Sequence, residues 1–267
     1  MGPDVVNHPL SRADGSTVLS NGLYTVIAGV NGPIEVQRRD ELPEEAAIEV
    51  NVRPASGVGG ICERWMETVL QSALKSIMLV HMFPRTLIQI TMQITKEPSI
   101  KLRRSLYDFA LMPTLFNAAI TCLVDGGLPL ATTSTAALAI ISPDDQVVLD
   151  PQEKEIASCK SIHAMAFSAN GDQILTQSSG DLNHEDWGKV ADMLKQACIA
   201  AIGPAGEDTA MSNGVVQPEP WLRQHLEDEA KSAVRGKVKI EAQGRSREIR
   251  SSSAANSKDE NQPDSAT

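Results

Sequence analysis

Acidic side chains that could bind a metal gather near the middle of the sequence. Asp150, Glu153 and Glu155 follow the apolar run 147–149, and an Asp-Asp pair precedes it at 144–145. Two carboxylates at the end of a strand can hold a divalent cation for phosphoryl transfer. The pair at 144–145 follows a proline and is typical of a turn, and a solvated loop is the alternative interpretation of the whole group.

Positive charge gathers at one place in the expected globular part. Lys96, Lys101, Arg103 and Arg104 lie in a short charged insert, and such a cluster would bind phosphate groups in a salt-sensitive, sequence-independent way. Upstream, the glycine-rich stretch 57–60 precedes an expected helix, and the N-terminus of a helix attracts anions. The alternatives are a solvated helix edge for the basic cluster and a simple turn for the glycines.

Other patterns that indicate chemistry are missing from the sequence. It has no P-loop, no GxGxxG and no HExxH motif. Its five histidines are not paired with an evident Ser or Cys nucleophile, and its four cysteines form no CxxC pair. Buried thiols in a reducing compartment explain these cysteines. We therefore expect an intracellular, soluble protein with no metal, no cofactor, no secretory signal and no membrane span.

The balance of charges argues against a free-standing RNA-binding module. Asp and Glu outnumber Lys and Arg by 34 to 24, a formal net charge of -10, whereas non-specific nucleic-acid binders usually carry the opposite balance. Any RNA contact must therefore come from a local basic patch. Because 42% of the residues are hydrophobic and only 3% are aromatic, the core must be aliphatic.

The pattern of apolar residues predicts a mixed fold. Alternation and turn pairs predict strands at 16–20, 24–30, 46–54, 86–95, 132–141, 161–167 and 173–177, with a further turn at Asn31-Gly32-Pro33. Three-to-four spacing predicts helices at 61–82, 113–124 and 185–201, with Pro113 in the first turn of the second and Glu63, Glu67, Gln71 and Lys75 on the polar side of the first. The order of elements predicts an α/β (α+β) sandwich, with helices packed on mixed sheets.

The composition divides the chain into four parts. We expect an N-terminal arm at 1–11, one dense domain at 12–205, and an extension at 206–242 with one helix at about 220–234. Residues 231–250 hold seven Lys or Arg against two Glu, and after Ser251 the residues are mainly Ser, Asn, Asp, Gln and Ala without apolar periodicity; the last part of the chain is 243–267. Such a segment buries too little apolar surface to fold, so we expect a disordered tail.

Several short segments, taken in order, resemble those of RNase PH-like proteins. They are the opening Arg12-Ala13-Asp14-Gly15-Ser16 (RxDGS), the strands and turns at 24–35, 49–57 and 84–94, the stretch NAAITCLVDGGLP at 117–129, and VLDP at 148–151. The ordered set extends from residue 12 to about 203 and is similar to the RNase PH-like subunits of the eukaryotic RNA exosome.

This resemblance implies an RNase PH-like two-layer sandwich and a place in a larger assembly. Members of the family pair into dimers, and three dimers form a hetero-hexameric ring that S1/KH-type subunits cap and single-stranded RNA crosses. Active members cleave RNA with inorganic phosphate. The family also implies a location in the nucleus, nucleolus and cytoplasm, and a part in rRNA processing, RNA surveillance and mRNA turnover.

The phosphate loop of the active family members has no counterpart here. Those members carry DGGTR before the second helix, where two glycines let the backbone approach phosphate and the arginine binds it bidentately. The matching stretch is Asp108, Phe109, Ala110, Leu111 and Met112, which has neither the glycines nor the arginine. We interpret it as a degenerate phosphate loop.

The acid site departs from the family pattern as well. Asp150 matches one metal-binding acid, but the position six residues on is Ile156, and the adjacent Glu155 is expected to point the other way along a strand end. Losing either part should remove several kcal/mol of transition-state stabilisation. Arg64 matches a phosphate-binding arginine at the first helix start, but the surrounding residues differ and we assign it no catalytic role.

These departures favour a subunit that acts by assembly and RNA contact rather than by catalysis. Lys101, Arg103, Arg104 and Arg64 are the candidates for RNA contact. One alternative is an active phosphate-dependent 3'-5' exoribonuclease with Asp150 and Glu155 as its acids. Another is a scaffold unrelated to RNA, which would be a stable monomer or homodimer.

Overall fold

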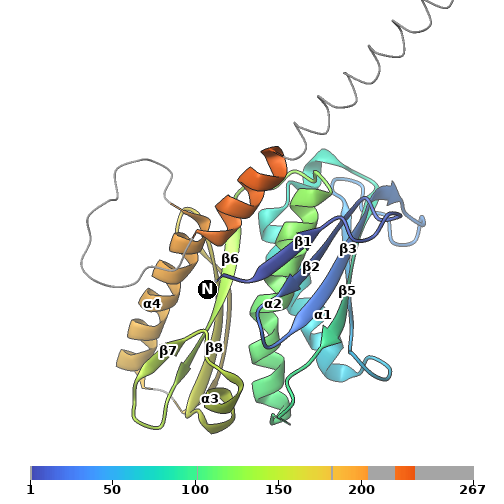
Figure 1. Cartoon of the computed structure of the whole chain (residues 1–267). Helices are drawn as coiled ribbons and strands as arrows, with labels where there is room; N and C mark the ends of the chain where they lie inside the picture. Colours follow the sequence, from blue (N-terminus) through green and yellow to red (C-terminus); the bar gives the residue numbers. More distant parts are fainter. Residues whose placement is uncertain (1, 101, 182, 204–219, 232–267) are drawn as a thin grey trace, which may run out of the picture. The chain divides into compact units, whose positions relative to one another are not determined.

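The computed structural model describes residues 2–100, 102–181, 183–203 and 220–231. Its contacts divide the chain into two units, residues 1–221 and 222–267. In the second unit the described residues, 222–231, are helical and lie within the helix expected at 220–234. The rest of the expected extension and the expected tail at 243–267 lie outside the described residues. The first unit contains two sheets and the helices that pack on them (Figure 1).

The first sheet has five strands in the order β1-β2-β3-β5-β4. They are β1 (Asp4–Asn7), β2 (Gly15–Ser20), β3 (Thr25–Glu35), β4 (Ala47–Arg53) and β5 (Thr86–Lys96). Neighbours are antiparallel except β4 and β5, which are parallel and are connected through helix α1 (Ile61–Ile77). Side chains alternate between the two faces of each strand, so Ile48, Val50 and Val52 of β4 reach the core as expected.

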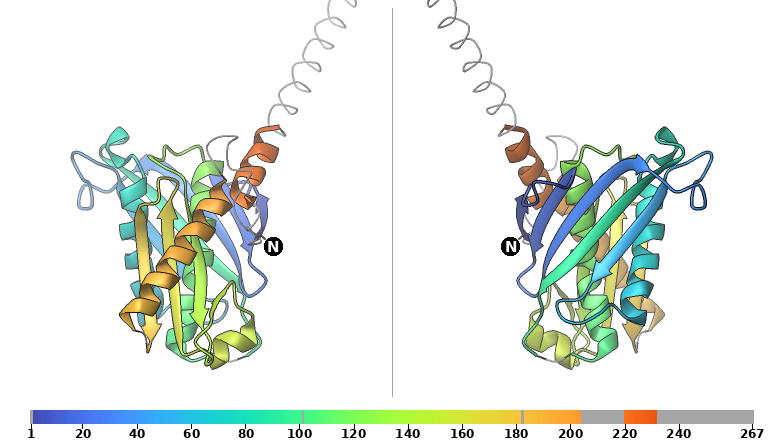
Figure 2. Two further views of the ribbon diagram at one scale, coloured as in Figure 1. Left: turned by 90° about the vertical axis from the view of Figure 1, so that its left-hand side faces the viewer. Right: turned by 90° about the vertical axis from the view of Figure 1, so that its right-hand side faces the viewer.

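The second sheet is antiparallel, in the order β7-β6-β8-β9. Its strands are β6 (Ser134–Ile141), β7 (Val147–Leu149), β8 (Ser161–Ser168) and β9 (Gln173–Gly180). Every residue of β8 is buried, because helix α2 (Arg104–Asp125) covers one face of the sheet and α4 (His184–Ile202) covers the other. The left view of Figure 2 shows α4, in orange, lying across the strands.

Helix α2 lies between the two sheets and contacts β2, β3, β6 and β8. A helix enclosed in this way needs apolar residues all round. The segment Leu106–Asp125 is long and apolar enough to cross a membrane by length and composition, but 83% of its most apolar window is buried inside the protein. It is therefore the central core helix of this unit.

Two polar side chains of α1 bind the open edge of β4. Glu67 Oε1 accepts a hydrogen bond from the Val52 N–H at 2.8 Å, and Gln71 Nε2 donates to the Ile48 carbonyl at 2.7 Å. These bonds satisfy backbone groups that an edge strand leaves unpaired. On the predicted polar side of α1, Gln71 is exposed and Glu67 is partly buried, whereas Glu63 is only 6% exposed.

The predicted helix limits differ from the structure at two places. α1 ends at Ile77, and a separate 3-10 turn, η1 (Val80–Met82), follows it. α2 begins at Arg104, so Pro113 lies inside the helix rather than in its first turn. A proline there costs about 3 kcal/mol, but the helix upstream of it buries residues 110–112 completely, which offsets that cost.

Three further segments differ from the sequence analysis. The expected turn at 31–33 is a bulge within β3, where the Gly32-Pro33 peptide is cis. The expected arm at 1–11 includes β1, which pairs with β2, and the contacts place the division between the two units after Trp221. A short helix, α3 (Glu153–Ser158), follows β7. The short strand β7 was not among the predicted strands. The remaining strands and α4 lie close to where the pattern predicts them, and the mixed α/β sandwich is confirmed.

Candidate functional site

The N-terminus of α1 borders a hollow of about 540 Å³. The expected anion-binding glycines and the start of the basic insert meet here. The described residues that line it come from two segments: Pro54, Ser56, Val58, Gly60 and Glu63 around the start of α1, and Glu97, Pro98, Ile100, Leu102 and Tyr107 around the start of α2. The structure therefore brings together two regions that the sequence analysis singled out separately.

A carboxylate of the chain itself caps the first turn of α1. Glu63 Oε2 accepts a hydrogen bond from the Gly60 N–H at 2.7 Å, which is the half of a capping box that a glycine cap still permits. An anion at a helix N-terminus binds such N–H groups. The glycine stretch 57–60 is thus a helix start with its own anionic cap, and this arrangement disfavours a second anion.

Side-chain bonds fix the segment that leads into α2. Tyr107 donates its hydroxyl hydrogen to Glu97 Oε1 at 2.8 Å, and the Ile100 N–H donates to a Glu153 carboxylate oxygen of α3. Tyr24 packs edge-on against Tyr107, with ring centroids 5.5 Å apart. Burial first, and then the Glu97 carboxylate, raises the pKa of both tyrosines. Both phenols are therefore neutral at physiological pH.

The stretch expected to be a degenerate phosphate loop is not a loop. Asp108, Phe109, Ala110, Leu111 and Met112 all belong to α2, where the backbone N–H groups of a helix interior are taken up by the helix itself. Residues 110–112 are fully buried and the ring of Phe109 contacts that of Trp65, with centroids 5.7 Å apart. These residues form part of the core. The prediction of a loop is therefore wrong, and the stretch is a buried helix.

The residues of the expected acid site point in different directions. Asp150 follows β7 with a positive φ of 48°, whereas Glu155 and Ile156 lie on α3 rather than on a strand end. Glu155 Oε2 accepts a hydrogen bond from the Gln152 N–H at 2.7 Å and so caps α3. Ile156 is fully buried in the core. A group of three or more His, Cys, Asp or Glu side chains that could hold a metal is absent from the described residues.

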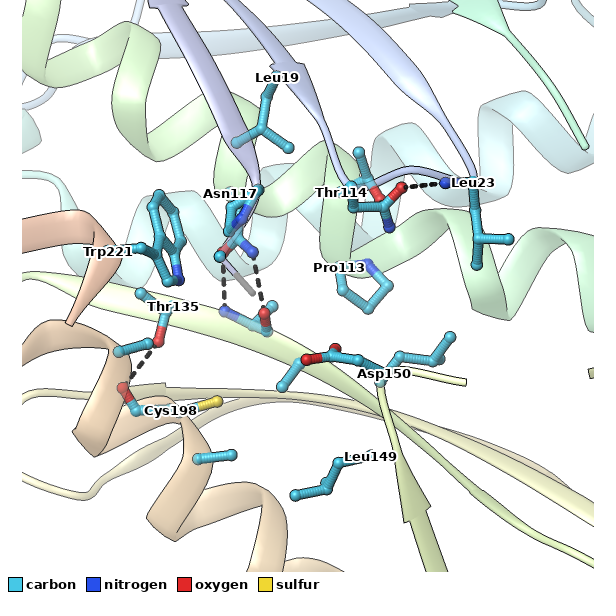
Figure 3. Close-up of a pocket in the computed structure, with 18 of the residues that line it drawn as sticks. Leu19, Leu23, Pro113, Thr114, Asn117, Thr135, Leu149, Asp150, Cys198 and Trp221 are labelled. Atoms are coloured by element: carbon cyan, nitrogen blue, oxygen red, sulfur yellow. Dashed lines mark hydrogen bonds between the residues drawn. The ribbon is translucent and has the colours of Figure 1, made fainter. Parts of the chain in front are cut away.

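Asp150 lines a second hollow of about 330 Å³, between α2 and the second sheet. Its carboxyl group points into this hollow among Pro113, Leu149 and Asn117 (Figure 3). The residue as a whole is exposed, but partial desolvation of the carboxyl group raises its pKa. The Asn117 side chain in the same wall is already engaged, since it exchanges two hydrogen bonds with the Ala136 backbone at 2.8 and 2.9 Å.

The thiols of the described chain show no sign of activation. All four cysteines are unpaired by disulfides, and Cys122 and Cys198 are buried. Burial raises the pKa of each of these two thiols to about 12, so neither forms the thiolate that a nucleophile requires. The expectation that these residues are small buried hydrophobes is confirmed for Cys122 and Cys198, whereas Cys62 and Cys159 are partly exposed.

Only part of the expected RNA-contact set lies within the described residues. Arg64 is exposed on α1, and Arg103 is exposed at the residue before α2. Neither is among the residues that line the hollow at α1. Lys101 and the side chain of Arg104 lie outside the described residues, so their contact with RNA stays a prediction.

A buried histidine forms a polar group that the sequence analysis did not find. His163 of β8 is fully buried, and its Nδ1 and Nε2 lie 2.9 Å from the Ser178 and Ser161 hydroxyl oxygens. Burial lowers its pKa, so the ring is neutral. The alternation along β8 placed His163 in a strand, but the partner Ser178 is on β9 and becomes a neighbour only when the two strands pair.

Comparisons with known proteins agree with this fold. The model of the 3' exoribonuclease family, domain 1, matches residues 6–129. The chain is 32% identical over 196 residues to the exosome complex component RRP46 of Saccharomyces cerevisiae, covering 71% of this chain and 86% of that protein. It is 31% identical over 188 residues to rrp46 of Schizosaccharomyces pombe, covering 68% and 77%.

Solved structures extend the comparison. The crystal structure of rice Rrp46 is 29% identical, with a TM-score of 0.62 over 72% of this chain and 86% of the rice chain. A chain of the Archaeoglobus fulgidus exosome with RNA bound at its active site is 15% identical, with a TM-score of 0.59 over 73% of this chain and 84% of the archaeal one. At that identity the archaeal likeness shows the fold alone.

Proposed function

Because the chain belongs to the RNase PH family of 3' exoribonucleases and exosome components, we propose that it is a non-catalytic ring subunit of an RNA exosome. In this role it supports 3'-to-5' RNA processing and degradation through assembly and RNA contact. The relatives named as exosome components RRP46 and rrp46 support the assembly part of the proposal.

The observation that carries the non-catalytic part is the state of residues 108–112. The resemblance implies that active members hold inorganic phosphate with a glycine-containing stretch and an arginine, whose N–H groups stabilise the charge on the phosphate. Here the matching residues are helical, and three of them are fully buried. The core position of Ile156, where the resemblance implies a second metal-binding acid, supports the same proposal.

Partners and location follow from the same proposal. The chain would sit in a hetero-hexameric ring of RNase PH-like subunits, beneath S1/KH-type cap subunits, in the nucleus, nucleolus and cytoplasm. Its tasks there would include rRNA maturation, RNA surveillance and mRNA turnover. Arg64 and Arg103, both exposed, together with Lys101 and Arg104, would contact the backbone of single-stranded RNA through charge rather than sequence.

An activity assay on the purified chain tests the non-catalytic part. Single-stranded RNA, Mg²⁺ and inorganic phosphate are supplied, and nucleoside diphosphates are measured against an active RNase PH as positive control. We expect no phosphate-dependent release above a blank. Release that disappears in the Asp150→Asn variant would establish the active exoribonuclease instead.

The native mass of the complex tests the assembly part. We expect the chain, co-expressed with the other RNase PH-like chains of its organism, to purify in a particle that contains one copy of it among several different chains. A stable monomer or homodimer under the same conditions would favour the scaffold unrelated to RNA. The two experiments are independent, so one part of the proposal can fail without the other.

A further inference from the structure

Two aliphatic side chains project almost completely into solvent where α1 begins. Val58 is 92% exposed and Ile61 is 88% exposed, and these are the largest exposures among the described large hydrophobic residues. Ile100, 38% exposed, lies across the same hollow as Val58. Val58, Ile61 and Ile100 are called the α1 tip below. Scattered apolar residues on a surface are ordinary, but Val58 and Ile100 line one hollow and Ile61 follows Val58 by three residues.

The backbone conformation before α1 holds the side chains of the α1 tip out in solvent. Gly57 adopts a positive φ of 84°, a conformation that glycine takes without strain, and the turn it makes leaves Val58 clear of the domain. Glu63 already caps the N-terminus of α1 at this point. The helix start therefore exposes apolar surface beside a carboxylate that belongs to the chain itself.

The hollow at the α1 tip is lined by apolar and acidic side chains. Pro98 and Leu102 extend the apolar wall, and Glu97 is an exposed carboxylate that keeps a hydrogen bond from Tyr107. The charged residues among the described lining of the hollow are Glu63 and Glu97, both acidic. The exposed Arg64 and Arg103 are not among the residues that line the hollow.

The acidic charge in the hollow indicates whether a protein or an RNA binds at the α1 tip. A phosphate backbone would meet the Glu97 carboxylate with like charge, whereas a lysine or arginine would meet it with opposite charge. Aliphatic side chains also gain more from burial against another protein than against a polyanion, and contiguous apolar surface marks protein interfaces. Both arguments favour a protein segment.

We propose that the α1 tip docks on a neighbouring protein subunit of the assembly, whose apolar side chains cover Val58, Ile61 and Ile100 and whose Lys or Arg side chain meets Glu97 in the hollow. This inference rests on the proposed function, because the neighbour is a subunit of the same ring particle. It adds a specific surface and a chemistry for the contact.

The test uses the particle reconstituted with the other RNase PH-like chains. A photoreactive amino acid at position 58 should cross-link to one neighbouring subunit, in a peptide that contains Lys or Arg. The Val58→Asp, Ile61→Asp double variant should weaken incorporation into the particle at least tenfold, which corresponds to about 1.4 kcal/mol. Both side chains are solvent-exposed, and an Asp at the first residue of α1 suits the helix dipole, so the variant should fold.

The control is Met193→Asp on α4, which is also an exposed apolar residue, at 37%, and which should leave incorporation unchanged. A second variant, Glu97→Lys, should weaken incorporation by repelling the basic partner. If the particle forms with wild-type affinity in the double variant, the inference is wrong while the ring proposal stands. Cross-links to RNA alone would also overturn it. If no particle forms with the wild-type chain, the ring proposal itself fails and the inference falls with it.

Discussion

Glu63 shows how one side chain can change the chemistry of a helix start. A helix N-terminus attracts anions through its free N–H groups and its dipole, and the glycines before α1 leave space for one. Glu63 bonds the Gly60 N–H at 2.7 Å and is only 6% exposed. A Glu three residues after a helix cap is a pattern that the sequence displays, so this residue could have been recognised; it was placed instead on the polar side of the helix.

Removal of the Glu63 cap should lower stability. We expect Glu63→Ala to reduce the free energy of unfolding by about 1 kcal/mol, within the usual range for lost caps, as measured by urea denaturation. Glu63→Gln keeps an oxygen that can accept the Gly60 N–H and should lose less. Equal losses in the two variants would contradict a capping role.

His163 makes a prediction about pH. Its folded-state pKa lies below that of an exposed histidine because the ring is buried, so the unfolded chain binds the proton more readily. Stability from this residue is complete above about pH 6.5, the unfolded value, and is lost as the pH falls from there toward the lowered folded-state pKa.

The matched variant for this effect is His163→Gln, which can still bond a serine hydroxyl but does not titrate. We expect the free energy of unfolding of the wild type to fall more steeply below pH 6.5 than that of the variant, by at most about 1.4 kcal/mol per pH unit. Urea denaturation at pH 5.5, 6.5 and 7.5 gives the slope of the free energy of unfolding against pH for each protein. The contributions of all other titrating groups cancel in the difference between the two slopes. Parallel slopes would contradict the argument.

At the scale of elements, periodicity located most strands but not the limits of the helices. Strand β5 was identified because its β-branched residues alternate, and α4 because its apolar stripe is regular. The predicted helix begins only at Pro113, because a proline usually begins or ends a helix. Only the tertiary burial of residues 110–112 between the sheets reveals that the helix continues through it.

The same limit applies to the candidate site. Residue identity alone shows that residues 108–112 contain no glycine or arginine and that residue 156 is an isoleucine; that these positions match the phosphate loop and an acid of active relatives stays a prediction. Whether Glu155 could substitute depended on the local backbone, which a six-residue helix determines. On α3, Glu155 bonds the start of its own helix while Ile156 faces the core.

Placing an acid at position 156 should therefore harm the fold. Ile156 is fully buried, so Ile156→Asp removes apolar contacts and buries a carboxylate without a partner, at a cost of roughly 3 kcal/mol or more. The control is Ala157→Asp, which places the same charge on the exposed side of α3 and should change stability by less than about 0.5 kcal/mol. A stable Ile156→Asp variant that binds Mg²⁺ would contradict this interpretation.

For the whole molecule, the charge balance and the fold lead to the same expectation about ligands. A chain of net charge -10 repels free phosphate, and none of the structural features described at α1 or α2 offers it a loop of open N–H groups. A ligand that binds only the folded state raises stability by RT ln(1 + [L]/Kd). A phosphorolytic enzyme should therefore melt at a higher temperature with phosphate and Mg²⁺, and this protein should not.

Thermal denaturation at constant ionic strength measures that difference. We expect the melting temperature of the isolated chain to change by less than about 1 °C between 10 mM phosphate with Mg²⁺ and a chloride buffer with Mg²⁺, since at 100 times Kd a ligand would add about 2.7 kcal/mol. Mg²⁺ in both buffers removes any general effect of the cation on an acidic protein, and an active RNase PH verifies that the assay detects phosphate. A phosphate-specific rise that Asp150→Asn abolishes would show that the pocket still binds its substrate, and the chain would then have to be regarded as an enzyme.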